Sequence, residues 1–237
     1  MRARFCVENN KFDLANLRAE FPSIAQQFSM DWEIVSATAP TRTLIMVSQY
    51  DHCLGDLLYR WHKNELNMEI TAVVSNHKTL RAMVEREGIR FIYLPVDKEN
   101  KPQQEQTLLD IIKETNTELT ILARYMQVLS DDLCRQLSGR VINIHHSFLP
   151  GFKGAKPYHQ AYERGVKLIG ATAHYVTPDL DEGPIIEQAV QVVDHTYTPD
   201  MLVAVGRDTE TRALARAVNL HTEHRVFLDG NKTVIFK

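Results

Sequence analysis

Residues 141–150 read Val-Ile-Asn-Ile-His-His-Ser-Phe-Leu-Pro, an apolar, β-branched run that turns polar before a proline. This pattern is typical of a buried strand that delivers polar side chains at its carboxyl end. Side chains two residues apart on a strand lie on the same face. We therefore expect Asn143 and His145 to point together and His146 to point the other way.

An acidic turn downstream adds a third group. Residues 179–184 read Asp-Leu-Asp-Glu-Gly-Pro. A carboxamide beside an imidazole, with Asp181 available from this turn, supplies an oxyanion donor, an acid or base and an orienting carboxylate. Asn143, His145 and Asp181 therefore suit the transfer of an acyl-type group. Taken without the strand, Asp179, Asp181 and Glu182 also fit a plain solvated turn or a cation site.

Residues 41–144 alternate short apolar runs with longer helical patterns, which predicts strands and helices in strict alternation. The predicted strands are 43–47, 69–74, 91–94, 119–122 and 141–144, and the predicted helices are 52–65, 78–87, 102–116 and 130–137. Repeated β-α-β order predicts an α/β fold with a doubly wound, mainly parallel sheet. Ligands bind beyond the carboxyl ends of such strands, where the polar residues after Val141 emerge.

The two ends of the chain have a different organisation. Strands at 168–176 and 184–193, a helix at 199–224 and a hairpin at 226–228 and 233–236 are expected in the last third. In the first forty residues, predicted strands 2–7 and 31–37 flank a helical pattern. One β-α-β unit leaves strand edges uncovered, so we expect a homo-oligomer. The sequence Ala39-Pro-Thr41 marks a boundary between segments 1–40 and 41–237.

Composition favours a small-molecule partner. The 237 residues include 27 Lys and Arg against 30 Asp and Glu, a formal charge of −3 that gives no attraction for nucleic acid or an anionic membrane. Cys6, Cys53 and Cys134 lack metal-site or disulfide spacing, so no metal is expected and a reducing cytoplasm fits best. No apolar run reaches membrane-spanning length.

Several motifs in order carry a family resemblance. Asn143-Ile-His145, Pro150, the strand Gly170-Ala-Thr-Ala-His174 and the turn ending at Pro184 together resemble the formyltetrahydrofolate-dependent formyltransferase family. Within it, residues 52–58, 157–162, 170–176 and 206–208 are most similar to the deformylase branch. The resemblance implies a formyltransferase-like, Rossmann-type fold. Residues 1–40 resemble the second half of an ACT regulatory domain, an ACT-like remnant.

The resemblance also implies a reaction. Water would attack the formyl group on N10 of 10-formyltetrahydrofolate and release formate and tetrahydrofolate, which supplies formate for purine biosynthesis and balances the one-carbon folate pools. The folate is then the substrate, and no tightly bound cofactor is expected. Asn143, His145 and Asp181 occupy the family's catalytic positions. Our hypothesis is that Asn143 and His145 stabilise the oxyanion, while Asp181 holds His145 charged and orders the water.

The same resemblance places the folate in a pocket. The segment after the strand at 119–122 would line it, with the residues from 176 onward as the other wall. The expected substrate-binding residues are Tyr125, Met126, Gln127, Val128, Leu129, His174, Val176 and Asp179. His174 fits a core histidine as well as a residue that supports the site. A glycine-containing loop at 151–154 fits either a lid or a plain surface connection.

Two other functions compete with hydrolysis. Glycinamide ribonucleotide transformylases of the family carry a glycine-rich phosphate loop after the first strand, but residues 48–52 read Ser-Gln-Tyr-Asp-His, which favours water as acceptor. Methionyl-tRNA formylation is disfavoured by the near-neutral charge. A folate-binding or amino-acid-sensing protein without turnover is the alternative of another class, supported only by the ACT-like segment.

Overall fold

The computed structural model describes residues 1–6, 13–147 and 157–237, which fall into two compact units. The N-terminal unit is Met1–Ala39 and the main unit is Pro40–Lys237.

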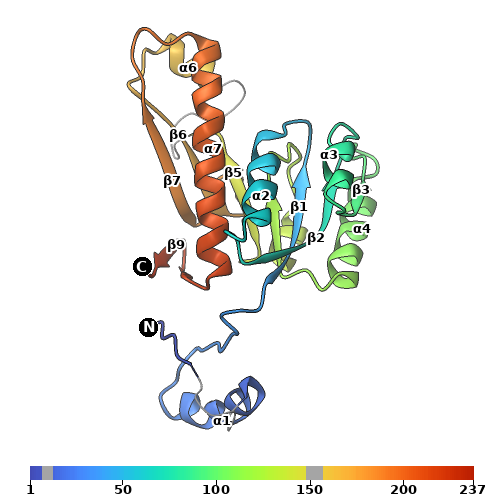
Figure 1. The fold of residues 1–237 in the computed structure, drawn as a ribbon, viewed down its shortest axis with the longest axis vertical. Helices are drawn as coiled ribbons and strands as arrows, with labels where there is room; N and C mark the ends of the chain where they lie inside the picture. The colour runs from blue at the N-terminus through green and yellow to red at the C-terminus, as the bar shows by residue number, and fades with distance from the viewer. Residues whose placement is uncertain (7–12, 148–156) are drawn as a thin grey trace. The chain divides into compact units, whose positions relative to one another are not determined.

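A single seven-stranded sheet forms the centre of the main unit (Figure 1). Its strand order is β3-β2-β1-β4-β5-β6-β7. The strands are β1 (Thr41–Val47), β2 (Met68–Ser75), β3 (Phe91–Tyr93), β4 (Leu119–Leu122), β5 (Val141–His145), β6 (Leu168–Tyr175) and β7 (Ile185–Val192). β1 to β5 pair in parallel, whereas β5 with β6 and β6 with β7 are antiparallel. The predicted doubly wound, mainly parallel sheet is therefore confirmed.

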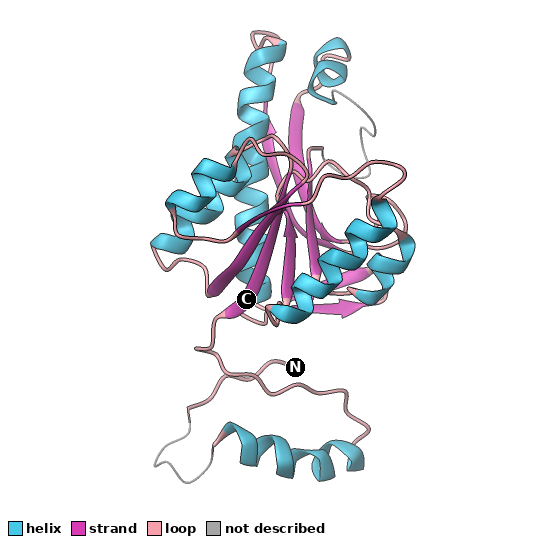
Figure 2. Cartoon of the chain, turned by 90° about the vertical axis from the view of Figure 1, so that its right-hand side faces the viewer, coloured by secondary structure: helices cyan, strands magenta, loops and turns pink. Residues whose placement is uncertain are grey.

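Helices cover both faces of this sheet (Figure 2). The helices of the main unit are α2 (His52–His62), α3 (Arg81–Arg86), α4 (Lys101–Glu114), α5 (Asp131–Gln136), α6 (Pro157–Glu163) and α7 (Pro199–Thr222). Buried side chains of α2, α3 and α7 pack on one face, which we call the α2/α7 face. Those of α4 and α5 pack on the other, the α4/α5 face.

The central strands read as unbroken apolar runs because both of their faces are covered. In β1, Ile45 joins the core of the α2/α7 face, while Leu44 and Met46 join that of the α4/α5 face. In β5, Val141 faces α4 and α5 and Ile142 faces α2 and α7. The order in which strands are added to the sheet reverses between β1 and β4, so the carboxyl ends of these strands and of β5 surround one region, as in other doubly wound folds.

Most predicted elements of the main unit appear within a few residues of their expected bounds. The last pair, β8 (Val226–Asp229) and β9 (Lys232–Ile235), forms the predicted hairpin, and Gly230 takes the left-handed conformation its turn requires (φ 57°). Helix α6 is not among the helices that the sequence predicts. The loop at 151–154 lies outside the described residues. Within the described part of the chain, no helix is long and apolar enough to cross a membrane.

The N-terminal unit contains helix α1 (Leu14–Gln27), with Asp13 as its N-cap. The strands predicted at 2–7 and 31–37 are wrong as far as the chain is described, because residues 1–6 and 31–37 form no strand. These segments find no partner to complete a ladder. The unit is held instead by contacts such as the Phe21–Trp32 ring pair (4.9 Å between centroids). Its assignment as an ACT-like remnant stays a prediction.

Candidate active site

The end of β5 presents Asn143 and His145 beside the antiparallel strand β6. Asn143 pairs with His174 and His145 with Thr172 across the two strands. The Asn143 Nδ2 lies 3.3 Å from His174 Nε2. Val141 faces α4 and α5, so Asn143 and His145, two and four residues on, project toward the same face.

The turn between β6 and β7 brings Asp181 to these side chains. One carboxylate oxygen, Oδ2, lies 3.2 Å from His145 Nδ1, and the other, Oδ1, lies 3.7 Å from His174 Nε2. Asp181 adopts a left-handed backbone conformation (φ 57°), a strained state that recurs at functional sites. Gly183 lies directly against β6, where a Cβ atom would overlap the Tyr175 carbonyl oxygen. The close fit of this turn therefore sets the position of the carboxylate.

The charge state of Asp181 fixes how His145 is oriented. Burial alone would raise the pKa of Asp181, but hydrogen bonds from His145 and His174 outweigh it and hold that pKa well below its usual range. An ionised carboxylate only accepts hydrogen bonds, so His145 donates from Nδ1. His145 Nε2 is then left buried without a hydrogen-bond partner among the described residues. A buried polar atom of this kind calls for a ligand or water.

His174 supports the site from β6. Its side chain is 2% exposed, and its Nδ1 donates to the Tyr175 carbonyl oxygen at 2.9 Å. Nε2 is therefore the ring atom that meets Asn143 and Asp181. The structure places His174 between two of the predicted catalytic residues rather than on a pocket wall.

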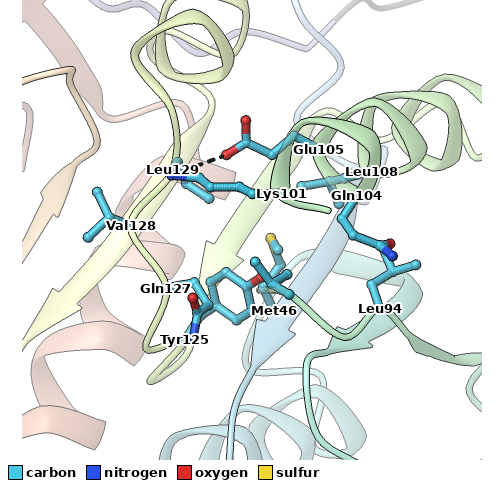
Figure 3. A pocket seen from close by; sticks show the side chains of 11 residues that line it. Met46, Leu94, Lys101, Gln104, Glu105, Leu108, Tyr125, Gln127, Val128 and Leu129 are labelled. Carbon is cyan, nitrogen blue, oxygen red and sulfur yellow. Dashed lines mark ion pairs between the residues drawn. The ribbon is translucent and has the colours of Figure 1, made fainter. Parts of the chain in front are cut away.

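A pocket opens on the α4/α5 face, between α4 and the segment that follows β4 (Figure 3). The free space among its lining residues is about 310 Å³, part of which is open to solvent. Four of the predicted folate-binding residues line it: Tyr125, Gln127, Val128 and Leu129. Burial, with the nearby charge of Glu105, raises the pKa of Tyr125 to about 12, so its hydroxyl stays protonated.

The other predicted pocket residues lie elsewhere. Met126 is half-exposed, and its backbone N–H donates to the Ser48 hydroxyl. Val176 packs against the core of the α4/α5 face, and Asp179 is an exposed residue whose carbonyl oxygen accepts from the Thr177 hydroxyl. None of these three lines the pocket.

Sequence reasoning missed the opposite wall of the pocket. That wall comes from β1, the segment after β3 and helix α4: Met46, Leu94, Val96, Lys101, Gln104, Glu105 and Leu108. On α4, Lys101 lies 4.0 Å from Glu105, and Glu105 also accepts the Ser130 N–H at 2.8 Å. The periodicity of residues 102–116 predicts a helix with one buried face, but it contains no signal that polar residues beside that face border a pocket.

A second polar cluster, also missed, lies on the α2/α7 face. Its centre is Glu210 of α7, which is 1% exposed and contacts His52, Arg124 and Tyr158. His52, Cys53 and Glu210 offer ligand atoms within 4.8 Å of one another, the spacing of a metal site. Burial, with Glu210, raises the pKa of the Cys53 thiol, and Arg124 already neutralises the carboxylate. These groups suit an internal ion network better than a metal.

His146, which follows β5, lies on the same side of the sheet as this polar cluster. Its ring centroid lies 6.5 Å from that of Tyr158 and 5.1 Å from that of His145. Burial, with the charges of Arg124 and His145, lowers the pKa of His146 to about 4, so the ring is neutral near pH 7. It adds no positive charge at the end of β5.

Comparison with known proteins agrees with this geometry. Residues 41–218 match the formyl transferase family. A formyltetrahydrofolate deformylase from Corynebacterium sp. (strain P-1) is 54% identical over the whole chain and over 83% of its own length. The chain belongs to the formyl transferase family, among the formyltetrahydrofolate deformylases.

Solved structures of this family show the same arrangement of strands and helices. The crystal structure of a formyltetrahydrofolate deformylase from Burkholderia mallei matches 96% of the chain and 81% of that protein, with 55% identity and a TM-score of 0.92. Glycinamide ribonucleotide transformylase 1 from Symbiobacterium toebii matches 88% of the chain and 99% of that protein, with 26% identity and a TM-score of 0.78. The formyl transferase fold therefore serves proteins named for different formyl acceptors.

Proposed function

We propose that this chain is a hydrolase that converts 10-formyltetrahydrofolate and water to tetrahydrofolate and formate. One observation carries the proposal: His145 Nε2 is buried without a partner among the described residues, on the same face of β5 as Asn143, while Nδ1 of the same ring is held by Asp181. His145 acts in this proposal as the imidazolium, with both ring nitrogens protonated, so that Nε2 is a hydrogen-bond donor. A donor that is pre-oriented in this way has its greatest effect on a charge that develops during the reaction.

The reaction follows from this arrangement. Water adds to the formyl carbon, and the carbonyl oxygen becomes an oxyanion that accepts hydrogen bonds from Asn143 and His145. The C–N10 bond then breaks, N10 takes up a proton, and formate leaves. The oxyanion exists only after attack, so these hydrogen bonds stabilise the transition state more than the bound substrate. That difference lowers the activation barrier.

Asp181 acts in this mechanism chiefly by orientation. A carboxylate whose pKa lies well below its usual range is a weak base, so it would relay a proton rather than keep it. It orders the attacking water and holds the Nδ1–H of His145, which keeps Nε2 pointed at the substrate. His174, on the other carboxylate oxygen, limits the freedom of the same group.

The pocket on the α4/α5 face is the site we propose for the pterin ring. Leu108 and Leu129 supply apolar contact, and polar groups such as Gln127 can orient the ring. The pocket-lining segment follows β4, which is the neighbour of the catalytic strand β5 in the sheet. Leu122, which ends β4 just before the pocket-lining segment, pairs with Asn143 across the sheet. Met126, Val176 and Asp179 remain proposals for contacts with other parts of the substrate.

The decisive experiment incubates the purified chain with 10-formyltetrahydrofolate, with and without amine acceptors, and measures formate and tetrahydrofolate. Equal amounts of formate and tetrahydrofolate without any acceptor support hydrolysis. Product that forms only with an amine would replace this proposal by formyl transfer. Tight folate binding without turnover would indicate a sensor.

Further proposals concern the need for a cofactor, the cellular compartment and the oligomeric state. We propose that it needs no tightly bound cofactor, because the described catalytic groups provide donors and a carboxylate for the whole reaction. Its three cysteines are free, which fits a reducing cytoplasm. The homo-oligomer expected from the sequence stays a prediction, which light scattering tests: a mass equal to one chain would contradict it.

A further inference from the structure

His174 lies on β6 where this strand meets the predicted catalytic groups. Its side chain is 2% exposed, and it pairs with Asn143 across the two strands. Its Nδ1 lies 2.9 Å from the Tyr175 carbonyl oxygen. A carbonyl oxygen only accepts hydrogen bonds, so Nδ1 carries a proton. The second ring nitrogen, Nε2, therefore decides by its proton whether the ring is neutral or charged.

Nε2 of His174 faces two groups that make opposite demands. The Asn143 amide nitrogen, 3.3 Å away, only donates hydrogen bonds and needs an unprotonated Nε2. The ionised Asp181 carboxylate, with Oδ1 3.7 Å away, only accepts and needs a protonated Nε2. One nitrogen cannot serve both groups at once. The ring thus has two states, a neutral one that bonds to Asn143 and a charged one that bonds to Asp181.

The proposed hydrolysis releases a proton beside this junction. Asp181 orders the attacking water, but a carboxylate whose pKa lies well below its usual range does not keep the proton. His145, on the other carboxylate oxygen, already carries a proton on each ring nitrogen in the proposed mechanism and cannot take another. The neutral His174 ring offers a lone pair on the side of Oδ1. An imidazole is the side chain best suited to take up and return a proton near neutral pH.

The same change of state frees a hydrogen-bond donor for the oxyanion. In the neutral state, Nε2 of His174 accepts an N–H of Asn143 and holds the amide in one orientation. Once Nε2 is protonated, this N–H has lost its acceptor, and the oxyanion formed in the same step takes its place. The hydrogen bond to the oxyanion is then made in the transition state and not in the bound substrate.

We propose that His174 is the proton acceptor behind Asp181, and that its protonation releases the Asn143 amide to the oxyanion. The inference deepens the proposed hydrolysis and rests on it. His174 acts through Asp181 and Asn143 and not on the substrate itself, so it is a positioning residue that also holds a proton between two steps.

The proton and the electrons balance over the two steps. As the water oxygen bonds to the formyl carbon, the carbonyl π electrons become the oxyanion, and the water proton passes through Asp181 to His174 Nε2. When the oxyanion collapses, the C–N10 bond breaks and its electron pair goes to N10. The proton returns from Nε2 through Asp181 to N10. The formic acid that leaves gives its own proton to the solvent and becomes formate.

The first test measures the state of the ring without turnover. The whole chain is prepared with isotope-labelled histidine nitrogens, and NMR at the pH of the assay reports which ring nitrogens carry protons. The His174→Gln protein identifies the signals by their loss. We expect a protonated Nδ1 and an unprotonated Nε2 in the resting protein. A protonated Nε2 would overturn the proposal, because the ring could then accept no further proton.

The second test removes the proton acceptor but keeps a polar group. In His174→Gln, an amide lies near the position of Nε2 and takes up no proton. Its kcat for formate release should fall about 10²-fold, with little change in KM because His174 does not line the pocket. Single-turnover rates in mixtures of ordinary and heavy water should follow a curve for wild type, where several protons move, and a straight line for His174→Gln.

Two further variants serve as control and substitute. His221→Gln makes the same exchange at another buried imidazole, which bonds to the Tyr175 hydroxyl, and should keep the wild-type kcat and the curve. His174→Asn retains a donor near the position of Nδ1 and has no atom at Nε2. It should lose kcat and the curve as His174→Gln does, and it decides the question if His174→Gln fails to fold.

The outcomes separate the proposal from the function on which it rests. A folded His174→Gln protein with the wild-type kcat would overturn the proposal. A low kcat with the curve retained would overturn it too, because His174 would then only support the fold of the site. Absence of formate from wild-type protein is a failure of the proposed hydrolysis itself, visible before any variant is compared.

Discussion

Asp181 shows how single residues combine the functions of the site. Its two carboxylate oxygens meet different imidazoles, His145 and His174, and His174 in turn meets Asn143. The left-handed backbone of Asp181 is tolerated best by Asp, Asn and Gly. An Asn substitution at this position therefore removes the charge without adding backbone strain.

We expect Asp181→Asn to lower kcat for formate release by about 10²- to 10⁴-fold, the range for loss of an acid–base or oxyanion-stabilising group. The physical reason is that an amide neither holds the His145 Nδ1–H as a charge partner nor orders the attacking water. Glu182→Gln, the same loss of a carboxylate at the next, exposed residue of the turn, is the matched control and should retain its activity. Near-normal turnover by Asp181→Asn would contradict the assignment.

Val128 offers a test of the pocket that leaves the catalytic groups intact. It lines the pocket and is 56% exposed, so a larger side chain is accommodated without disturbing the core. Val128→Trp should raise KM for the folate about tenfold with little change in kcat, because it removes binding shared by ground state and transition state. Steady-state kinetics measure both constants. Val190→Trp, on exposed β7, serves as control, and an unchanged KM would place the pterin elsewhere.

At the scale of elements, the β6–β7 hairpin positions the catalytic carboxylate. Strand β6 carries His174 and pairs antiparallel with both β5 and β7, so the turn that connects β6 to β7 returns to the carboxyl end of the catalytic strand. Gly183 allows this turn to lie against Tyr175, and the Tyr175 N–H donates to the Pro184 carbonyl oxygen at 2.9 Å. The hairpin thus replaces a further parallel β-α unit with a rigid connection.

Gly183→Ala should destabilise the protein by about 1–3 kcal/mol and reduce formate release, because the added methyl group overlaps backbone that cannot move freely. Urea unfolding and turnover measure the two effects. Gly55→Ala, in helix α2, is the control. Its Cβ would meet only the flexible end of Met83 at 3.2 Å, and alanine favours the helix. A Gly183→Ala protein as stable and active as wild type would refute this account of the turn.

At the scale of the whole molecule, stability should depend on pH through buried neutral histidines. His221 of α7 forms a hydrogen bond between its Nδ1 and the Tyr175 hydroxyl (2.6 Å). Burial, helped by the charge of His224, lowers the pKa of His221 to about 4. The unfolded chain, with a histidine pKa of about 6.5, binds this proton first as the pH falls. Stability from His221 is therefore complete above about pH 6.5 and is lost as the pH falls toward 4.

Between about pH 6.5 and 4, the unfolding free energy of the wild type should fall by roughly 3 kcal/mol more than that of the His221→Gln protein. The quantity to compare is the change in unfolding free energy with pH, from urea titrations of both proteins. His195→Gln, at an exposed position, should keep the wild-type slope. A His221→Gln protein with the same slope as wild type would show that His221 does not stay neutral in the folded state.

Local pattern predicted most of the main unit because each element carries its own periodicity. The apolar run at 43–47 predicted β1, and the helical pattern at 130–137 predicted α5, whose N-cap Ser130 accepts the Leu133 N–H with its side chain. The same reasoning failed for residues 2–7 and 31–37. A strand forms only when it pairs with another strand, and the described residues 1–6 and 31–37 form none.

The sequence by itself determined the order of strands and helices, the shared face of Asn143 and His145, and the turn that carries Asp181. Only the tertiary structure decided that His174 lies between Asn143 and Asp181, that α4 supplies the far wall of the pocket, and that Glu210 meets Arg124. The reason is physical: periodicity along the chain encodes which face of an element is buried, whereas contacts between distant elements depend on how those faces pack together.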